Sequence, residues 1–484
     1  MILINSLDIL QNQDQEINIL DLATQEFTNC IIKAANISIP KKKLGAKPKP
    51  WWNKDLKDLR KVMIFRQRCL IKSNSLDLKQ DYLRARNSYF LAIKNAKRKH
   101  WNKFLEKEDP KSIFKAMSYT KDKLVERIPS IKSTRLDSLE TTFQGQCSSF
   151  RTTLFPTPPN TSRPSWEGYK PIDWKWPILS KIELENTCLG KIKGKTPGPD
   201  LINQDIISRA YKAIPNMFYK LYSCLINIGY HPSSWRQAIG AILKKPNKPN
   251  YSLPKAYRVI SLLNCLGKIS ERILAQRLSY LAETTTLLHS SQIGGRKKKS
   301  AIDAALLLTN EIEVNKSLKL KTSTLLLDVK GAFDHVAKNQ LLAILKDLRL
   351  PSSLIAWVYT FLSRRLLKLA FNDQIEQFSE LETGIPQGSP ISPILFLIYI
   401  RNLFVSKAVK IISYINNISL TVAITSFKKN IKILEREVAL IYKLGIENAI
   451  QFDLEKTELI HFGHFTIELE LPNSLIIKPK ELVK

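Results

Sequence analysis

The sequence is short of acidic residues, cysteine pairs and long apolar runs, and each shortage argues against a class of protein. Its 43 Asp and Glu residues face 75 Lys and Arg residues, giving a formal charge of +32 and a pI of about 9.8. So basic a chain favours polyanionic partners, with nucleic acid considered first and an anionic membrane surface second.

The six cysteines are scattered without a Cys-x-x-Cys pair, and no histidine stands at zinc-finger spacing from them. We therefore expect free thiols in a reducing compartment. The longest apolar run, near 391–400, is shorter than the roughly 20 residues that a membrane span requires. Residues 1–10 lack the basic lead of a signal peptide and include Asp8. These features predict an intracellular protein of the nucleus or cytoplasm, with no membrane partner.

A chain of 484 residues with 44% apolar content can hold two or three folded domains. One amphipathic helix is expected at about 20–35. The basic, Pro-containing stretch at 40–50 is either a solvated linker or a nuclear-localisation patch. From 51 to about 119 the pattern is helical and basic with interleaved aromatics, which suits phosphate neutralisation and base stacking. The aromatics are equally consistent with the core of a helical hairpin.

Two segments in the second half of the chain are candidates for chemistry. Residues 324–329 form a short apolar run that ends on Asp328, as in a buried strand with an acid at its tip. Residues 384–390 form a turn-rich loop, and the nearly all-apolar stretch 391–404 after it predicts a buried helix. A strand tip and a loop of this kind can present polar groups to one site.

A third segment predicts a β-hairpin, with strands 411–415 and 418–422 joined by Asn416 and Asn417. In order and spacing, the three segments resemble motifs A, B and C of a reverse transcriptase palm, specifically that of non-LTR (LINE-type) retrotransposons. The resemblance implies an α+β fold with right-hand fingers and palm, preceded by a basic, mostly helical region. One departure stands out, because the family's Tyr-x-Asp-Asp is Tyr414-Ile415-Asn416-Asn417 here.

The resemblance also implies a metal site. Nucleotidyl transfer uses two divalent ions, Mg²⁺ or Mn²⁺, which prefer hard carboxylate oxygens. By match to the family, Asp328 and the Val329 carbonyl are metal ligands, and Asn416 stands at a further ligand position with Asn417 beside it. Lys456 matches motif D, where a lysine is placed to protonate the pyrophosphate.

Further positions are implied to contact the substrates. Lys245 and Arg258 fall where the fingers reach the triphosphate of the incoming nucleotide. Phe333 falls where a bulky residue meets the 2′-carbon, which would select deoxynucleoside triphosphates, and Gln387 would lie beneath nucleotide and template. Residues 291–299 are basic and are expected to grip the template backbone.

The two asparagines are expected to preserve the fold and impair the chemistry. Asn is nearly isosteric with Asp and suits a hairpin turn, but its amide oxygen is a neutral, weaker ligand. We expect weakened metal binding and severely reduced polymerase activity on an RNA template with a DNA primer. The alternative is a non-catalytic remnant that only binds nucleic acid. Both interpretations stay open from the sequence.

The resemblance divides the chain into five parts. We expect a fragment, because little of the chain is left for the endonuclease, thumb and RNase H regions of full-length relatives. The parts are a basic helical region (1–129), a Ser/Thr/Pro-rich connector (130–178), an extension ahead of the fingers (179–237), the fingers and palm (238–470), and a truncated tail (471–484).

Overall fold

The computed structural model describes residues 14–40, 49–73, 75–106, 127–133, 138–157, 161–174, 176–190 and 196–463. It consists of two units, one made of 1–38 with 127–484 and the other of 39–126, which are described separately. Most of the basic stretch at 40–50 and all of the predicted tail at 471–484 lie outside the described residues.

The smaller unit is a helical hairpin. Helix α3 (Lys54–Lys72) begins at Asn53, whose side chain accepts a hydrogen bond from the Leu56 amide (2.9 Å), and α4 (Leu76–Leu105) begins at Ser75 in the same way. Leu56 and Tyr89 are buried between the helices, whereas Phe90 is 53% exposed. Some aromatics of the hairpin therefore belong to its core and others are exposed on its surface. Neither base stacking nor core packing accounts for all of them.

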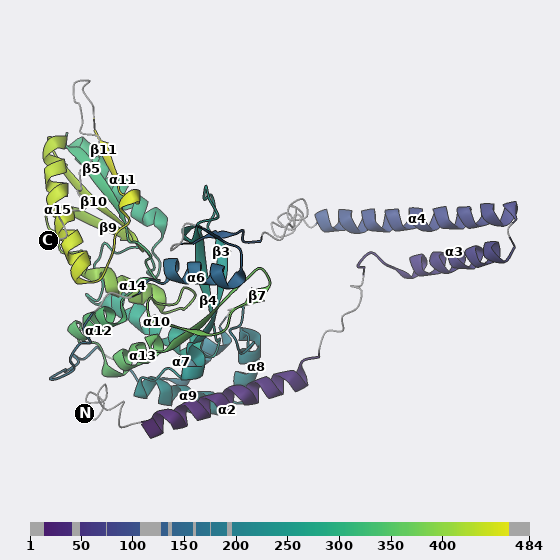
Figure 1. Ribbon diagram of the computed structural model, residues 1–484, viewed down its shortest axis with the longest axis horizontal. Coiled ribbons are helices and arrows are strands. Elements are labelled where there is room, and N and C mark those ends of the chain that lie inside the picture. Colours follow the sequence, from purple (N-terminus) through teal and green to yellow (C-terminus); the bar gives the residue numbers. More distant parts are fainter. Residues whose placement is uncertain are drawn as a thin grey trace. The chain divides into compact units, whose positions relative to one another are not determined.

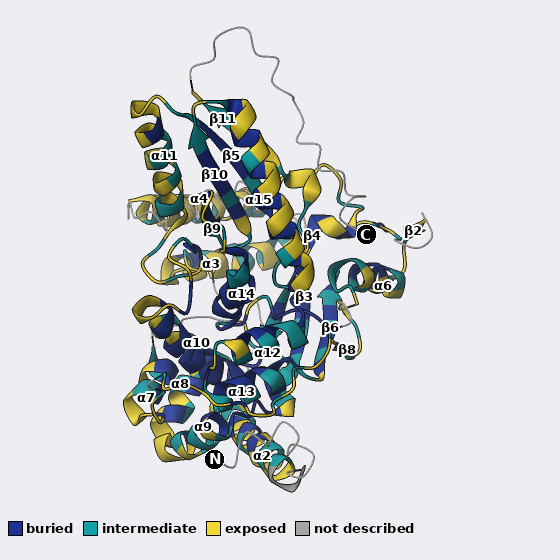
Figure 2. Ribbon diagram, turned by 90° about the vertical axis from the view of Figure 1, so that its left-hand side faces the viewer, coloured by how far each residue is buried: buried dark blue, intermediate teal, exposed yellow. Residues whose placement is uncertain are grey.

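The first sheet of the larger unit has the order β11 (Glu458–Phe462), β5 (Lys321–Asp328), β10 (Asn417–Ile424), β9 (Lys410–Tyr414), and all neighbours are antiparallel. Helices α11 (Ala301–Ser317) and α15 (Phe427–Glu447) pack against it (Figure 1). Strand β5 is almost wholly buried, in keeping with its run of Thr and Leu. Figure 2 shows buried residues concentrated in the strands and exposed residues along both helices.

The second sheet has the order β4 (Tyr257–Leu263), β3 (Gln237–Lys244), β6 (Arg365–Phe371), β7 (Gln374–Ile375), and β8 (Ser379–Leu381) also pairs with β6. Strands β3 and β6 run parallel. Helix α6 (Phe143–Leu154) packs on this sheet, where the rings of Phe143 and Phe371 lie 4.7 Å apart. The stretch 130–178, expected as a plain connector, thus supplies part of a core.

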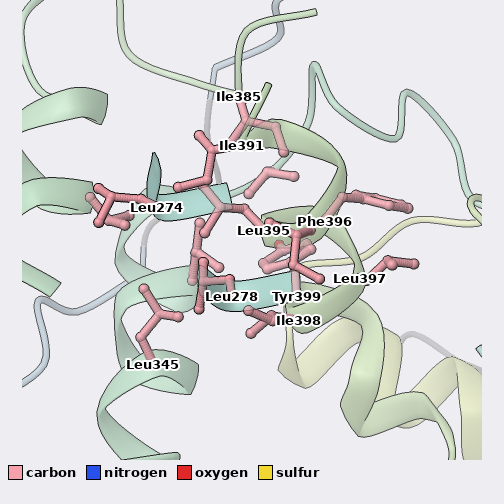
Figure 3. Packing of buried hydrophobic residues seen from close by; sticks show 14 of the residues in the cluster. Leu274, Leu278, Leu345, Ile385, Ile391, Leu395, Phe396, Leu397, Ile398 and Tyr399 are labelled. Atoms are coloured by element: carbon pink, nitrogen blue, oxygen red, sulfur yellow. The ribbon is translucent and has the colours of Figure 1, made fainter. Parts of the chain in front are cut away.

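A helical layer joins the two sheets, and its centre is α14 (Ser392–Ile400), shorter than the predicted helix over 391–404. Every residue from Ile394 to Ile400 is buried. Figure 3 shows the side chains of Leu395 to Tyr399 near Leu274, Leu278 and Leu345. The neighbouring helices are α7 (Lys181–Leu189), α8 (Gln204–Ala213), α9 (Pro215–Ile228), α10 (Gly267–Thr284), α12 (Lys338–Asp347) and α13 (Ser352–Leu362).

Helix α2 (Asp14–Ser38) belongs to this larger unit, although the sequence grouped it with the basic hairpin. The ring of Phe27 meets that of Phe218 edge-on at 4.9 Å, and the Asp21 carboxylate accepts a hydrogen bond from the Ser233 amide (2.9 Å). Within the described residues, no helix combines the length and apolar character needed to cross a membrane.

Candidate active site

A cavity of about 590 Å³ is lined by residues of both sheets and of the loops between them. It brings together residues that are more than 200 positions apart in the chain. Of the predicted site residues, it is lined by Lys245, Arg258, Asp328, Val329, Phe333, Gln387, Asn416 and Lys456. The fold therefore gathers in one place almost every position that the sequence singled out.

Asp328 is the last residue of β5, and its side chain is 11% exposed. The Lys456 ammonium donates a hydrogen bond to Oδ2 of Asp328, and the Asn416 side-chain nitrogen donates one to Oδ1. The backbone supports this arrangement, because the Val329 amide donates to the Asn416 carbonyl (2.9 Å) and the Asp453 amide donates to the Asp328 carbonyl (2.8 Å). Both oxygens of the buried carboxylate are thus occupied by protein donors.

The hairpin differs from its prediction by one residue. Strand β10 begins at Asn417, which pairs with both Tyr414 and Asp328, so the turn consists of Ile415 and Asn416 rather than Asn416 and Asn417. Ile415, the first of the two turn residues, has a positive φ of 57°, as tight two-residue hairpin turns require. Asn417 is exposed and does not line the main cavity. It lines a second cavity of about 480 Å³ with Tyr414, on the strands beside it.

Lys456 also contacts Asp453, at 3.0 Å between Nζ and Oδ2. Burial lowers the pKa of Lys456, but the bonds to Asp328 and Asp453 outweigh it, and the net shift is upward. The side chain remains 56% exposed, so water screens part of this attraction. A raised pKa keeps this lysine charged, as an acid that bridges two carboxylates.

Asp334 lies in the same cavity and is bound to Gln387, whose side-chain nitrogen donates to Oδ2 (2.8 Å). Burial raises the pKa of Asp334 to about 7, against the opposing charges of Lys245 and Arg365. Arg365 donates in turn to the carbonyls of Thr383 and Gly384. Asp334, for which no role was predicted, therefore holds the side chain of Gln387 in place.

Two glycines allow the loop at 384–390 to approach its neighbours. A Cβ on Gly384 would lie 2.6 Å from the Asp334 carbonyl oxygen, and a Cβ on Gly388 would lie 2.6 Å from the Ser261 carbonyl oxygen. Both have positive φ, at 76° and 119°. The Ser261 amide also donates to the Gln387 carbonyl (2.6 Å). This close approach fixes Gln387 between β4 and the turn after β5.

The predicted nucleotide-binding residues enter from separate elements. Arg258 is exposed on β4, and the Lys245 ammonium donates to the Lys255 carbonyl (3.0 Å). Burial, then the charges of Lys248 and Lys456, lowers the pKa of Lys245. Phe333 is half-buried, with its ring 5.3 Å from that of Phe396. An apolar surface and several cations therefore face one cavity.

Several basic side chains of this cavity were not predicted, because lysines are common in this chain and these belong to no recognisable motif. Four carboxyl groups also line the cavity: Asp328, Asp334, Asp453 and Glu455. Beside Lys456, five cations line it, here called the basic cluster: Lys245, Lys248, Lys255, Arg258 and Lys330. The spacing of Asp453 three residues before Lys456 was the one available signal for the ion pair.

The donor set does not fit a pair of divalent ions. A dication in such a site needs several anionic oxygens, yet Asn416 turns its nitrogen, a donor, toward Asp328, and Lys456 places a positive charge on the same carboxylate. In the parts of the chain that the structure describes, no group of three or more His, Cys, Asp or Glu side chains is arranged to hold a metal. As they are placed, Asp328 and Asn416 form no ligand set for two dications, and the metal roles of Asp328, Val329 and Asn416 stay predictions.

Part of the segment 291–299, which was predicted to bind the template backbone, contacts other parts of the domain instead. Arg296 is 7% exposed and pairs with Glu283 (2.7 Å). Gln292 forms an isolated bridge with Ser413, and the Ile293 amide donates to the Ser413 carbonyl (2.8 Å). This segment therefore supports β9, and only the lysines after Arg296 are available to a ligand.

Comparisons with known proteins show the family of this domain. Residues 242–481 match the family model described as reverse transcriptase (RNA-dependent DNA polymerase), and this segment includes all the predicted site residues. The chain belongs to the reverse transcriptase family through this domain, and the predicted fold is confirmed.

The domain is of the type found in non-LTR, LINE-type retrotransposons. The chain is 26% identical to a probable RNA-directed DNA polymerase from transposon X-element of Drosophila melanogaster, over 45% of this chain and 24% of that protein. It is 28% identical to a similar protein from transposon BS (43% and 23%) and 27% identical to the RNA-directed DNA polymerase from mobile element jockey (46% and 25%), both of the same species. The matches span about a quarter of each relative.

Proposed function

We propose that this chain is a reverse transcriptase domain that binds an RNA template, a DNA primer and deoxynucleoside triphosphates but has lost most of its polymerase activity. Reverse transcriptases normally use divalent ions held by carboxylates. The observation that carries the proposal is the hydrogen bond from the Asn416 amide to Asp328, made where a metal-binding domain needs a second acid. Such substrates occur in the nucleus and cytoplasm, and we propose either compartment.

The roles of the remaining residues follow from their positions. Asp328 and Lys456 face one another, so Lys456 is placed to hold or donate a proton at the end of β5. Phe333 supplies the apolar contact that would exclude a 2′-hydroxyl, and Gln387, held by Asp334, supports the nucleotide. These residues bind and orient the substrate, and the missing acids limit its reaction.

The test is primer extension on an RNA template, with the natural chain beside its Asn416→Asp/Asn417→Asp variant in the presence of Mg²⁺. We expect extension by the variant at least about a hundredfold above the natural chain, since each missing charge removes electrostatic stabilisation of the reaction. Adding Asp328→Asn to the variant is the control and should abolish the gain. Efficient extension by the natural chain would refute the proposed impairment.

A non-catalytic nucleic-acid-binding protein is the second candidate, favoured by the basic hairpin. This unit lies outside the matched segment, and most of the lysines and arginines in its described residues are exposed. On this reading, RNA and DNA bind with a steep salt dependence and without a divalent ion. Failure of the Asp variant to extend a primer, with RNA binding retained, would favour it.

A further inference from the structure

The cavity is arranged to accept phosphate charge without a metal ion. The Lys456 ammonium lies between Asp328 and Asp453, and Asn416 occupies the other oxygen of Asp328. Lys456 therefore offsets one of these two negative charges, and the Asn416 amide adds a neutral hydrogen-bond donor. A divalent ion would have to displace Lys456 or Asn416 to reach an oxygen of Asp328.

The cavity lining has a positive surplus, because Lys456 and the five cations of the basic cluster face four carboxyl groups, Glu455 included. Asp334 is bound to Gln387 and is partly buried, and the desolvation of its carboxyl disfavours the ionised form. In the basic cluster, by contrast, neither Lys330 nor Arg258 contacts a carboxylate of the described residues, and both side chains are exposed and line the cavity. The uncompensated charge of this cavity is thus positive.

Crowding of the cations favours an anion. The charges of Lys248, Lys456 and Arg258 all act to lower the pKa of Lys245, after the larger effect of its burial. A bound polyanion relieves this repulsion, and lysine and arginine are the usual partners of phosphate oxygens. The repulsion among these side chains is therefore a source of binding energy.

The remaining lining matches a nucleoside rather than phosphate alone. Phe333 offers an apolar surface and Gln387 an amide, both fixed by neighbours. The volume of about 590 Å³ lies in the range of small-molecule sites. A ligand with a ring system and a chain of phosphates fits both halves of the cavity.

From this arrangement we propose that the cavity binds a deoxynucleoside triphosphate without a divalent ion, with the basic cluster in place of the metal. The inference rests on the proposed function, since it concerns the same nucleotide site. It adds that Lys248, Lys255 and Lys330 contact phosphate, and that chelation leaves binding intact. Phosphoryl transfer is not part of the inference.

The experiment is equilibrium dialysis of the full chain with tritiated dTTP, in EDTA and in Mg²⁺. We expect dissociation constants that agree within about threefold in the two buffers, since Lys and Arg supply the phosphate contacts. Inorganic triphosphate should compete in EDTA. Absence of competition would show that phosphate is not what the cavity recognises, and would overturn the inference without depending on any variant.

Two pairs of variants sharpen the result. Lys330→Ala/Arg258→Ala should weaken binding in EDTA by about tenfold or more, because two charge-assisted contacts are lost. Arg209→Ala/Lys212→Ala removes the same two charge types from the exposed face of α8 and should leave binding unchanged. Equal losses of dTTP binding in both double variants would show that any loss of positive charge weakens binding. That result would overturn the proposal that the basic cluster contacts the phosphates.

In contrast to the natural chain, the double Asn→Asp variant should bind dTTP in a way that depends on Mg²⁺. Asn416→Asp/Asn417→Asp adds two negative charges, so dTTP binding should fall by about tenfold in EDTA and recover in Mg²⁺. If the natural chain itself binds dTTP only with Mg²⁺, the ion-free inference is wrong while the nucleotide site stands. If it binds in neither buffer, the nucleotide site of the proposed function fails as well.

Discussion

The side-chain nitrogen of Asn416 donates a hydrogen bond to the carboxylate of Asp328, the one acid at the tip of β5. A donor in this place stabilises a charged acid, where a second carboxylate would repel it. Asn416, which we propose impairs the polymerase activity, is therefore expected to increase the stability of the domain.

Restoring the acid at 416 should destabilise the metal-free protein. Asn416→Asp replaces a hydrogen bond to a buried charge with a like-charge contact, at a cost of about 2 kcal/mol. Asn417→Asp is the matched control, because Asn417 is exposed and pairs with Asp328 only through the strand register, at a cost below about 1 kcal/mol. Thermal unfolding in EDTA measures both. An Asn416→Asp chain as stable as the natural one would contradict this account of the site.

Asp334 should make stability fall as pH rises. Its folded pKa, raised to about 7 by burial, lies above its ordinary value of 3.8, so the folded state holds more protons between these values. Stability from this group is therefore full below about pH 4 and is lost as pH rises through 7. Asp334→Asn keeps an acceptor for Gln387 and should remove this dependence.

Between pH 5 and pH 8, the free energy of unfolding of the natural chain should fall by a few kcal/mol more than that of the Asp334→Asn chain. Chemical unfolding of both chains across this pH range measures the difference. Lys245 and Arg365 are the charged neighbours that oppose the shift. Asp347→Asn, an exposed change on α12, is the control and should leave the pH profile as it is. Parallel profiles for the natural and Asp334→Asn chains would show that Asp334 is ionised throughout.

Gly388 should be intolerant of any side chain. Its φ of 119° and the 2.6 Å approach of a Cβ to the Ser261 carbonyl make Gly388→Ala costly, by about 3 kcal/mol. Gly168→Ala is the control, since Gly168 also has a positive φ but no atom within 4 Å of a Cβ, and its cost should be near 1 kcal/mol. Melting temperatures of the two variants give the comparison, and equal shifts would rule out a steric cause.

The basic hairpin should bind nucleic acid through phosphate contacts. Lys94 and Arg98 lie one turn apart on the exposed side of α4. Replacing both by Ala should reduce the salt slope of single-stranded RNA binding by about 0.7 per residue, the value for one released counterion at each contact. Fluorescence anisotropy across a salt series measures this. The Arg209→Ala/Lys212→Ala chain should keep the natural slope, and an unchanged slope in the α4 variant would place the RNA elsewhere.

The sequence by itself indicated the fold class and most of the predicted site residues, through the resemblance of three of its segments to motifs A, B and C of reverse transcriptases. An apolar run ending on Asp328, a Pro-Gln-Gly loop and an Asn-Asn hairpin are local patterns, set by strand, turn and helix preferences that act over a few residues. For the same reason the basic, helical character of the segment after residue 51 was readable from composition alone.

Only the tertiary structure decided which side chains meet. The pairing of Lys456 with Asp328, of Gln387 with Asp334 and of Asn416 with Asp328 joins residues far apart in the chain, and no local pattern encodes such contacts. The one-residue shift of the hairpin turn had the same origin, because Asn417 is drawn into β10 by its pairing with β5. Long-range packing fixed these positions, and with them the charge of the cavity.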